Sequence, residues 1–255
     1  MAQNIGKKTA NSSKPLPQKQ DAVKFTAAFI SLLEETKDLN LIPKSYFVDD
    51  FTARFAKEPP IDINIEAKIF KKLDETRRFE FNSTFFNLGY LSLMYAFGKV
   101  EVETRGKASL ETIEDNDIEA VKNLFPPQII AMIEKSETLN SYFLKTENGI
   151  GYNTDFKIKD GKTFDKFLAD SNKITEAQRA FLNERSSPEK ARYTKTISQL
   201  RKMTNWTKNK TCGKDCEGFP TQTRYYELRY YPLYFKIVRE KGNYKIFELT
   251  IGAVD

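Results

Sequence analysis

Residues 223–254 read TRYYELRYYPLYFKIVREKGNYKIFELTIGAV, and they carry the clearest strand signal in the chain. Aromatic and β-branched side chains alternate with polar ones, as in strands that bury one face. Residues 241–243, Lys-Gly-Asn, provide the glycine and asparagine that the positive φ angles of a tight reversal favour. The stretch therefore predicts two antiparallel strands, 223–240 and 244–254, joined by a hairpin turn.

The alternation changes phase inside the first of these strands. The apolar positions are Tyr226, Leu228 and Tyr230 before the proline, and Leu233, Phe235 and Ile237 after it. Such a shift is typical of one inserted residue. It predicts a bulge or a strand bend near Tyr231 and Pro232.

Helical periodicity dominates the chain before residue 140. Helices are expected at 21–36, where an aspartate serves as N-cap, at 46–55, at 65–77, at 79–97 and from 127 through 133. The segment 79–97 either continues the helix before it or forms the most buried helix of the core. Residues 100–106 are expected to be strand or loop.

Strand and helix signals alternate between residues 141 and 182. Residues 142–159 predict a hairpin with Asn-Gly at its turn, at positions 148–149. Residues 160–162, Asp-Gly-Lys, predict a second turn. Two short helices follow, one around residues 164–168 and one behind a capping-box pattern that starts at Thr175.

Together these elements predict an α+β protein, in which N-terminal helices pack with a C-terminal antiparallel sheet built from hairpins. Residues 1–20 are polar and hold two prolines, so we expect a disordered lead-in there. Residues 21–255 are expected to form a single domain, and a subdivision near residue 140 is the alternative. With 255 residues, of which 40% are hydrophobic, the chain is long enough to bury a core.

The composition restricts the chemistry of any active site. The chain has 41 basic and 35 acidic residues and no histidine, which removes the commonest general base and the commonest transition-metal ligand. No phosphate-binding loop, dinucleotide-binding glycine motif or nucleophile elbow is present, so we expect no cofactor and no metal. No apolar run reaches the roughly 18 residues that cross a bilayer, so we expect no transmembrane segment.

The two cysteines, Cys212 and Cys216, are separated by three residues and lie in a glycine-rich stretch. This spacing is neither the redox motif nor part of a four-ligand zinc site, since no second pair exists. We interpret it as a small disulfide loop, which predicts an extracytoplasmic protein, either secreted or periplasmic. Two free thiols in a turn are the alternative.

The one strongly polarised stretch of the chain is basic and runs from Arg185 to Lys214. Its candidate binding residues are Arg201, Lys202, Trp206, Lys208 and Lys210. Cations with an interleaved aromatic residue are typical of a surface that binds an anionic partner, here a glycan, a nucleic acid or a membrane surface. A solvated basic surface that balances the acidic residues 111–119 is the alternative interpretation.

Tyrosines cluster on the predicted C-terminal strand, and alternation sends them to both faces of the sheet. Tyr226 and Tyr230 are therefore added to the candidate binding residues, although tyrosine in a strand is usually a packing residue. The sequence thus predicts a non-catalytic binding or structural module. An enzyme that uses carboxylate or tyrosine chemistry in a helix-on-sheet pocket is the alternative.

Overall fold

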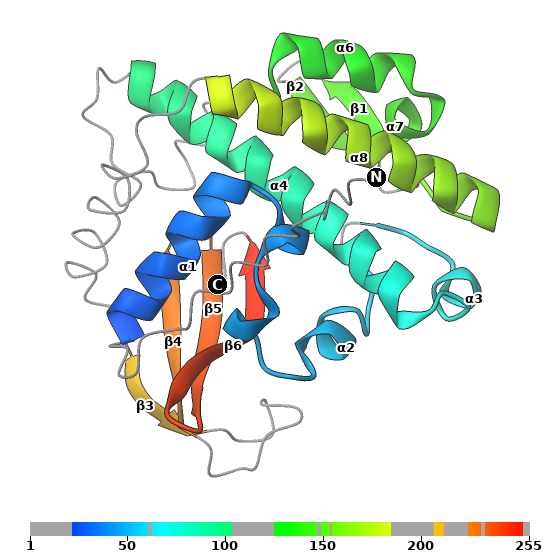
Figure 1. Cartoon of the computed structure of the whole chain (residues 1–255). Helices are drawn as coiled ribbons and strands as arrows, with labels where there is room; N and C mark the ends of the chain where they lie inside the picture. Colours follow the sequence, from blue (N-terminus) through cyan, green and yellow to red (C-terminus); the bar gives the residue numbers. More distant parts are fainter. Residues whose placement is uncertain are drawn as a thin grey trace, which may run out of the picture.

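The computed structural model describes residues 22–60, 63–103, 125–146, 149–153, 155–184, 207–211, 224–230 and 233–251. Helices fill the N-terminal part of this chain, and a four-stranded antiparallel sheet forms its C-terminal part (Figure 1). The predicted α+β class is therefore confirmed.

The helices are α1 (Ala22–Thr36), α2 (Phe51–Phe55), α3 (Ala67–Phe70), α4 (Glu75–Glu103), α6 (Pro127–Lys135), α7 (Glu137–Tyr142) and α8 (Gly161–Glu184). Two 3-10 turns, Leu39–Leu41 and Lys44–Tyr46, follow α1. A small hairpin pairs β1 (Phe143–Thr146) with β2 (Gly149–Tyr152). The predicted helices at 21–36 and after Pro126 are confirmed. The hairpin predicted in this region is also present, but Gly149 begins β2 and pairs with Thr146 instead of lying in the turn, and Asn148 lies outside the described residues.

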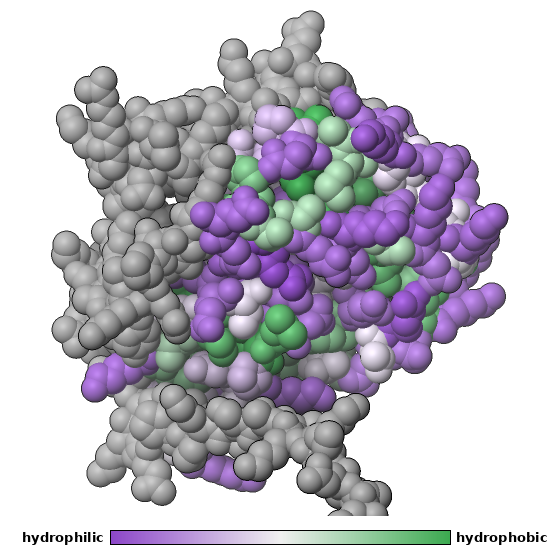
Figure 2. All heavy atoms as spheres, turned by 45° about the horizontal axis from the view of Figure 1, so that its top comes forward, coloured by the Kyte–Doolittle hydropathy of each residue, from purple (hydrophilic) through white to green (hydrophobic). Residues whose placement is uncertain are grey.

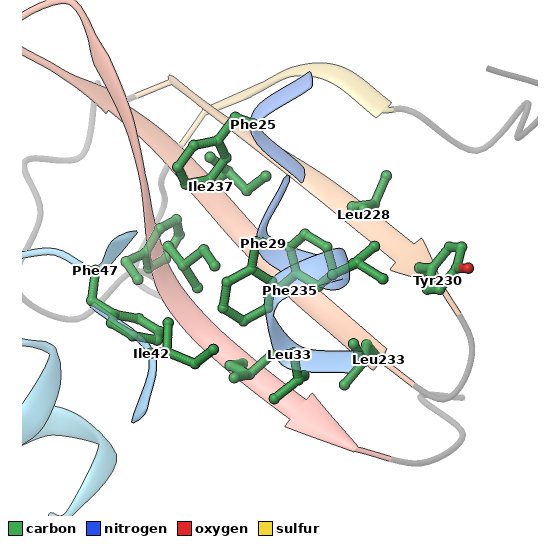
Figure 3. Packing of buried hydrophobic residues seen from close by; sticks show 14 of the residues in the cluster. Phe25, Phe29, Leu33, Ile42, Phe47, Leu228, Tyr230, Leu233, Phe235 and Ile237 are labelled. Carbon is green, nitrogen blue, oxygen red and sulfur yellow. The ribbon is translucent and has the colours of Figure 1, made fainter. Parts of the chain in front are cut away.

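The main sheet has the strand order β3-β4-β5-β6, so that β3 and β6 are its outer strands. Its strands are β3 (Thr207–Thr211), β4 (Arg224–Tyr230), β5 (Leu233–Glu240) and β6 (Asn243–Ile251). Helix α1 crosses one face of this sheet, where Phe25, Phe29 and Leu33 lie against side chains of β4 and β5 (Figure 3). The rings of Phe29 and Phe235 are 5.9 Å apart. The first helix and the C-terminal strands therefore share one hydrophobic cluster.

Helices α4 and α8 lie side by side and run in the same direction (Figure 1). Thr84 Oγ1 donates to Asn172 Oδ1 at 2.9 Å, and farther along both helices Gln178 Nε2 donates to Ser92 Oγ at 3.0 Å. Figure 2 shows the molecule turned so that the top of Figure 1 comes forward. The described part of that surface is mostly hydrophilic, with hydrophobic side chains gathered in patches between the hydrophilic ones.

Helix α4 contributes to two hydrophobic clusters. Phe86, Tyr90 and Leu91 belong to the cluster that α1 shares with the sheet. Phe81 and Leu88 belong to a second cluster, which also holds residues of α6, α7 and α8. The longest helix therefore packs against both halves of the described chain.

The bulge or bend predicted near Tyr231 and Pro232 falls on residues outside the described part, but the single strand predicted at 223–240 is wrong. β4 and β5 are separate antiparallel strands, and Tyr230 pairs with Leu233. The change of phase arises because the chain reverses between the strands. The irregularity in register lies elsewhere, between Lys236 and Ile237 in the pairing of β5 with β6.

Two predicted helices, at 164–168 and after Thr175, are one continuous helix, α8. Thr175 Oγ1 donates back to the carbonyl of Asn172 at 2.8 Å instead of capping a new helix. The turn predicted at 160–162 is the start of this helix, because Asp160 Oδ1 accepts from the Thr163 amide at 2.8 Å. A helix cap and a turn use the same residue types, so the sequence pattern did not separate them.

Three further predictions in the N-terminal part are wrong. The helix expected at 46–55 begins only at Phe51, because Val48 donates its amide to the Ile246 carbonyl at 3.0 Å and holds this segment extended beside β6. The helix expected at 65–77 is broken into the single turn of α3 and the start of α4 at Glu75. The strand or loop expected from residue 100 is helix at least to Glu103.

Candidate anion-binding site

Most of the basic stretch from Arg185 to Lys214 lies outside the described residues. This applies to Arg201, Lys202 and Trp206, and also to both cysteines, Cys212 and Cys216. Within the predicted set, Lys208 and Lys210 lie in β3, and Tyr226 and Tyr230 lie in β4. The structure therefore places the described part of the basic stretch in an outer strand of the main sheet.

The two outer strands of the sheet differ in what covers their edges. β3 pairs with β4 through Thr207–Glu227, Lys210–Tyr225 and Thr211–Arg224. On the opposite side of the sheet, β6 receives a parallel bridge from Phe47. Within the described chain, no strand or bridge pairs with the outer edge of β3.

The antiparallel register gathers basic residues from several strands at one end of the sheet. Lys210 pairs with Tyr225, which in turn pairs with Val238, next to Arg239. The turn between β5 and β6 adds Lys241 at the same end. We call this end of the sheet, with Lys210, Arg224, Arg239 and Lys241, the basic sheet end.

Sequence reasoning missed Arg239 and Lys241, because both lie outside the basic stretch that ends at Lys214. The hairpin pattern carried a signal that would have found them. Antiparallel strands bring the end of one strand beside the start of the next, so the charges at those positions add.

An aromatic cluster adjoins the basic sheet end. The rings of Tyr226 and Tyr244 are 5.8 Å apart, and the Arg239 guanidinium lies 5.9 Å from the centre of the Tyr244 ring. Tyr226 is half-buried, whereas Tyr230 is 5% exposed and belongs to the hydrophobic cluster under α1. Of the two predicted tyrosines, Tyr226 is therefore the one beside the cations, and the contacts of Tyr230 are those of a packing residue.

The acidic groups at this end are already paired with Lys245. Its ammonium lies 2.7 Å from Asp49 Oδ1 and 3.5 Å from Glu240 Oε2. The hydrogen bond from Lys245, together with its charge, lowers the pKa of the Asp49 carboxyl, and Lys241 adds a smaller effect. Arg239 and Lys241 form no ion pair in the described chain, so this end of the sheet carries excess positive charge.

Carboxylates and tyrosines also meet on the sheet, in a row across three strands. Glu227, Lys236 and Glu248 occupy paired positions on β4, β5 and β6, and Lys236 Nζ lies 2.9 Å from Glu248 Oε2. Burial, followed by a hydrogen bond to Glu227, raises the pKa of the Tyr234 hydroxyl. The Tyr225 hydroxyl donates to Glu227 Oε1 at 3.4 Å. This row holds the residue types that the alternative enzymatic function requires.

Two further findings concern only the part of the chain that the structure describes. No group of three or more Asp, Glu, Cys or His residues is placed to hold a metal ion there. None of the described helices is both long enough and apolar enough to span a membrane.

Comparison of this chain with protein families, with curated proteins and with solved structures finds no match to any of them.

Proposed function

We propose that this protein is a non-catalytic binding module that holds an anionic partner against the Arg185–Lys214 stretch and the adjoining basic sheet end. One observation carries the proposal. The register of the sheet aligns Lys210 of that stretch with the end of the sheet where Arg239 and Lys241 lie. Basic residues that are distant in sequence thereby lie at the same end of the sheet, where the half-buried Tyr226 is also found.

Binding to such a surface depends strongly on salt. Lysine and arginine contacts release the counterions condensed on a polyanion, so the affinity falls as the salt concentration rises. The matching experiment replaces Arg201, Lys202, Lys208 and Lys210 by serine and measures elution from a heparin column. We expect the wild type to elute well above physiological salt and the variant to elute earlier, with a nearly unchanged melting temperature.

A matched control removes the same charge from another surface. Lys44, Lys71, Lys72 and Lys162 are all exposed, and the quadruple serine variant of these residues should elute almost as the wild type does. Equal loss of retention in both variants would indicate a nonspecific effect of net charge. Elution of the wild type near physiological salt would refute the proposal.

We further propose that the protein is extracytoplasmic and that Cys212 and Cys216 form a disulfide. The support is their spacing in the sequence, because closure of a small loop by a disulfide is typical of oxidising compartments. Alkylation of the native, unreduced protein, followed by intact mass analysis, should label no thiol. Two labelled cysteines would refute both the disulfide and the compartment inferred from it.

The row of Glu227, Lys236 and Glu248 keeps an enzyme as the second candidate, because a tyrosine with a raised pKa adjoins it. Such groups suit acid–base catalysis when a substrate reaches them. A screen of chromogenic glycosides and esters, run beside Glu227→Gln, tests this candidate. Turnover that the variant loses would support an enzyme, and the absence of turnover would favour the binding module.

A further inference from the structure

Two residues other than glycine have a positive φ angle in the described chain, and both are lysines. They are Lys37, with a φ of 51°, and Lys241, with a φ of 48°. Side chains with a Cβ disfavour this left-handed region, so such a residue calls for an explanation. The two lysines differ in whether the fold supplies one.

Lys37 is explained by its own contacts. The residue is 6% exposed, and its ammonium donates to the Glu34 carbonyl at 2.6 Å and to Asn183 Oδ1 at 2.9 Å. Lys37 therefore closes the end of α1 and ties it to α8. The lysine side chain is long enough to make both contacts at once.

Lys241 has no comparable role in the fold. It forms the two-residue turn between β5 and β6 with Gly242, whose φ is 89°, and Glu240 pairs with Asn243 across the turn. Asparagine and glycine are the favoured residues at such positions. The asparagine that the sequence offers, Asn243, lies one position too late and starts β6. The side chain of Lys241 is exposed and makes no ion pair within the described chain.

Arg239 and the tyrosines beside it complete a surface around this lysine. Arg239 is exposed, and its Nε donates to the Gly242 carbonyl at 3.3 Å, which fixes the guanidinium next to the turn. The same guanidinium lies over Tyr244, which contacts Tyr226 and, at 6.1 Å, Phe25 of α1. The hairpin therefore presents two cations and an aromatic edge on a support that the core holds rigid.

We propose that the β5–β6 hairpin is a binding subsite for a linear anionic polysaccharide, in which Arg239 and Lys241 contact acidic groups and Tyr226 packs against a sugar ring. This inference rests on the proposed function. Arg239 and Lys241 lie two residues apart beside the rings of Tyr244 and Tyr226, and a chain that carries acidic groups on sugar rings complements both the cations and the aromatic edge. The proposed disulfide favours a polysaccharide over a cytosolic nucleic acid.

The experiment compares the variant Arg239→Ser/Lys241→Asn with the control Lys71→Ser/Lys72→Ser, which removes the same charge from exposed positions. The probe is a size-defined heparin oligosaccharide, titrated at several salt concentrations. We expect the hairpin variant to lose roughly tenfold in affinity and about two units in the slope of log K against log salt, one for each lost contact. Its melting temperature should equal or exceed that of the wild type, because asparagine suits the turn.

The Tyr226 contact is tested with Tyr226→Leu and Tyr226→Phe. The leucine variant should bind the heparin oligosaccharide more weakly but bind inorganic polyphosphate, which has no rings, as the wild type does. The phenylalanine variant keeps the ring and should restore heparin binding. Equal heparin affinity of the leucine variant and the wild type would overturn the role of Tyr226.

Failure of this inference is distinguishable from failure of the proposed function. If the Arg201/Lys202/Lys208/Lys210 variant loses heparin binding while the hairpin variant retains it, only the hairpin subsite is refuted. If the wild type does not bind heparin above physiological salt, the proposed function is refuted as well. Tighter binding of oligothymidylate of equal charge, or of phosphatidylserine vesicles, would overturn the choice of a polysaccharide.

Discussion

A lysine is an unusual residue with which to end a helix in the left-handed conformation, since glycine occupies this position without steric cost. At the end of α1, the amide of Lys37 donates to the Leu33 carbonyl at 2.7 Å, and its buried ammonium adds the contacts to Glu34 and Asn183. Backbone strain and side-chain hydrogen bonds therefore oppose each other at one residue. Their magnitudes decide the outcome of substitution.

We predict that Lys37→Met destabilises the protein more than Lys37→Gly does. Glycine relieves about 1–2 kcal/mol of left-handed strain while it loses the ammonium contacts. Both variants leave the Glu34 carbonyl and Asn183 Oδ1 without the Lys37 ammonium, at about 1–3 kcal/mol for each, but methionine also retains the strain and covers these acceptors with apolar atoms. Urea unfolding of the two variants measures the difference. A glycine variant that is the less stable of the two would show that strain at Lys37 is negligible.

Several elements are joined by polar contacts at their ends, and Asp170 is the clearest case. This α8 residue accepts from Ser136 Oγ at 2.7 Å and from Thr138 Oγ1 at 3.1 Å, and both donors lie at the start of α7. Ser136 also accepts from the Leu139 amide, so it caps α7 while it binds α8. The carboxylate therefore holds the beginning of one helix against the middle of another.

We predict that this contact makes stability depend on pH at the acidic end. Burial opposes ionisation of Asp170, but the hydrogen bonds from Ser136, Lys173 and Thr138 outweigh it, and the pKa of the carboxyl is lowered. A lowered folded-state pKa contributes stability that is fully present above the unfolded value, about 3.9, and is lost as the pH falls through the folded value. Asp170→Asn should therefore lower the unfolding free energy by about 1–2 kcal/mol at pH 7 and by less at pH 2.

The exposed Asp155 supplies a matched control for that measurement, because Asp155→Asn makes the same chemical change on a solvated side chain. Its unfolding free energy should follow that of the wild type at both pH values. A difference between Asp170→Asn and the wild type that is the same at pH 2 and pH 7 would contradict the predicted linkage.

The whole molecule is held together by α4, which contributes residues to both hydrophobic clusters. We propose that the described chain unfolds as one domain, since neither cluster is complete without this helix. Thermal unfolding followed by circular dichroism and by tyrosine fluorescence should give coincident transitions.

Leu91 and Leu88 test the coupling between the clusters, because they lie on α4 in the first and the second cluster respectively. We predict that Leu91→Ala and Leu88→Ala each lower the unfolding free energy by about 2–5 kcal/mol. Each variant should still unfold in a single transition, with its midpoint at a lower temperature than that of the wild type. Hydrogen exchange in α8 and in β5 should accelerate together in either variant. Two resolved transitions would instead indicate a division of the chain near residue 140.

The sequence by itself determined the local features of this protein. The periodicity of 22–36, the proline start of α6, the strand alternation and the turn before Asn243 are each carried by a few neighbouring residues, so propensity and pattern predict them. The distribution of the tyrosines over both faces of the sheet follows from the same alternation. The rings of Phe47, Phe51 and Phe55 stack with centres 4.2 and 5.4 Å apart, but only Phe51 and Phe55 lie on a helix, so this contact is not the helical periodicity expected at 46–55.

Only the tertiary structure decided how these pieces meet. The extension of Phe47 and Val48 beside β6, the continuity of α8 and the alignment of Lys210 with Arg239 and Lys241 all depend on partners far away in the chain. Packing of one sheet face against α1 selects the strand register, and the register then determines which charges become neighbours. Local patterns report backbone preference and periodicity but carry no information on register between distant strands, so the place of Lys210 at the same end of the sheet as the β5–β6 turn was not visible in the sequence.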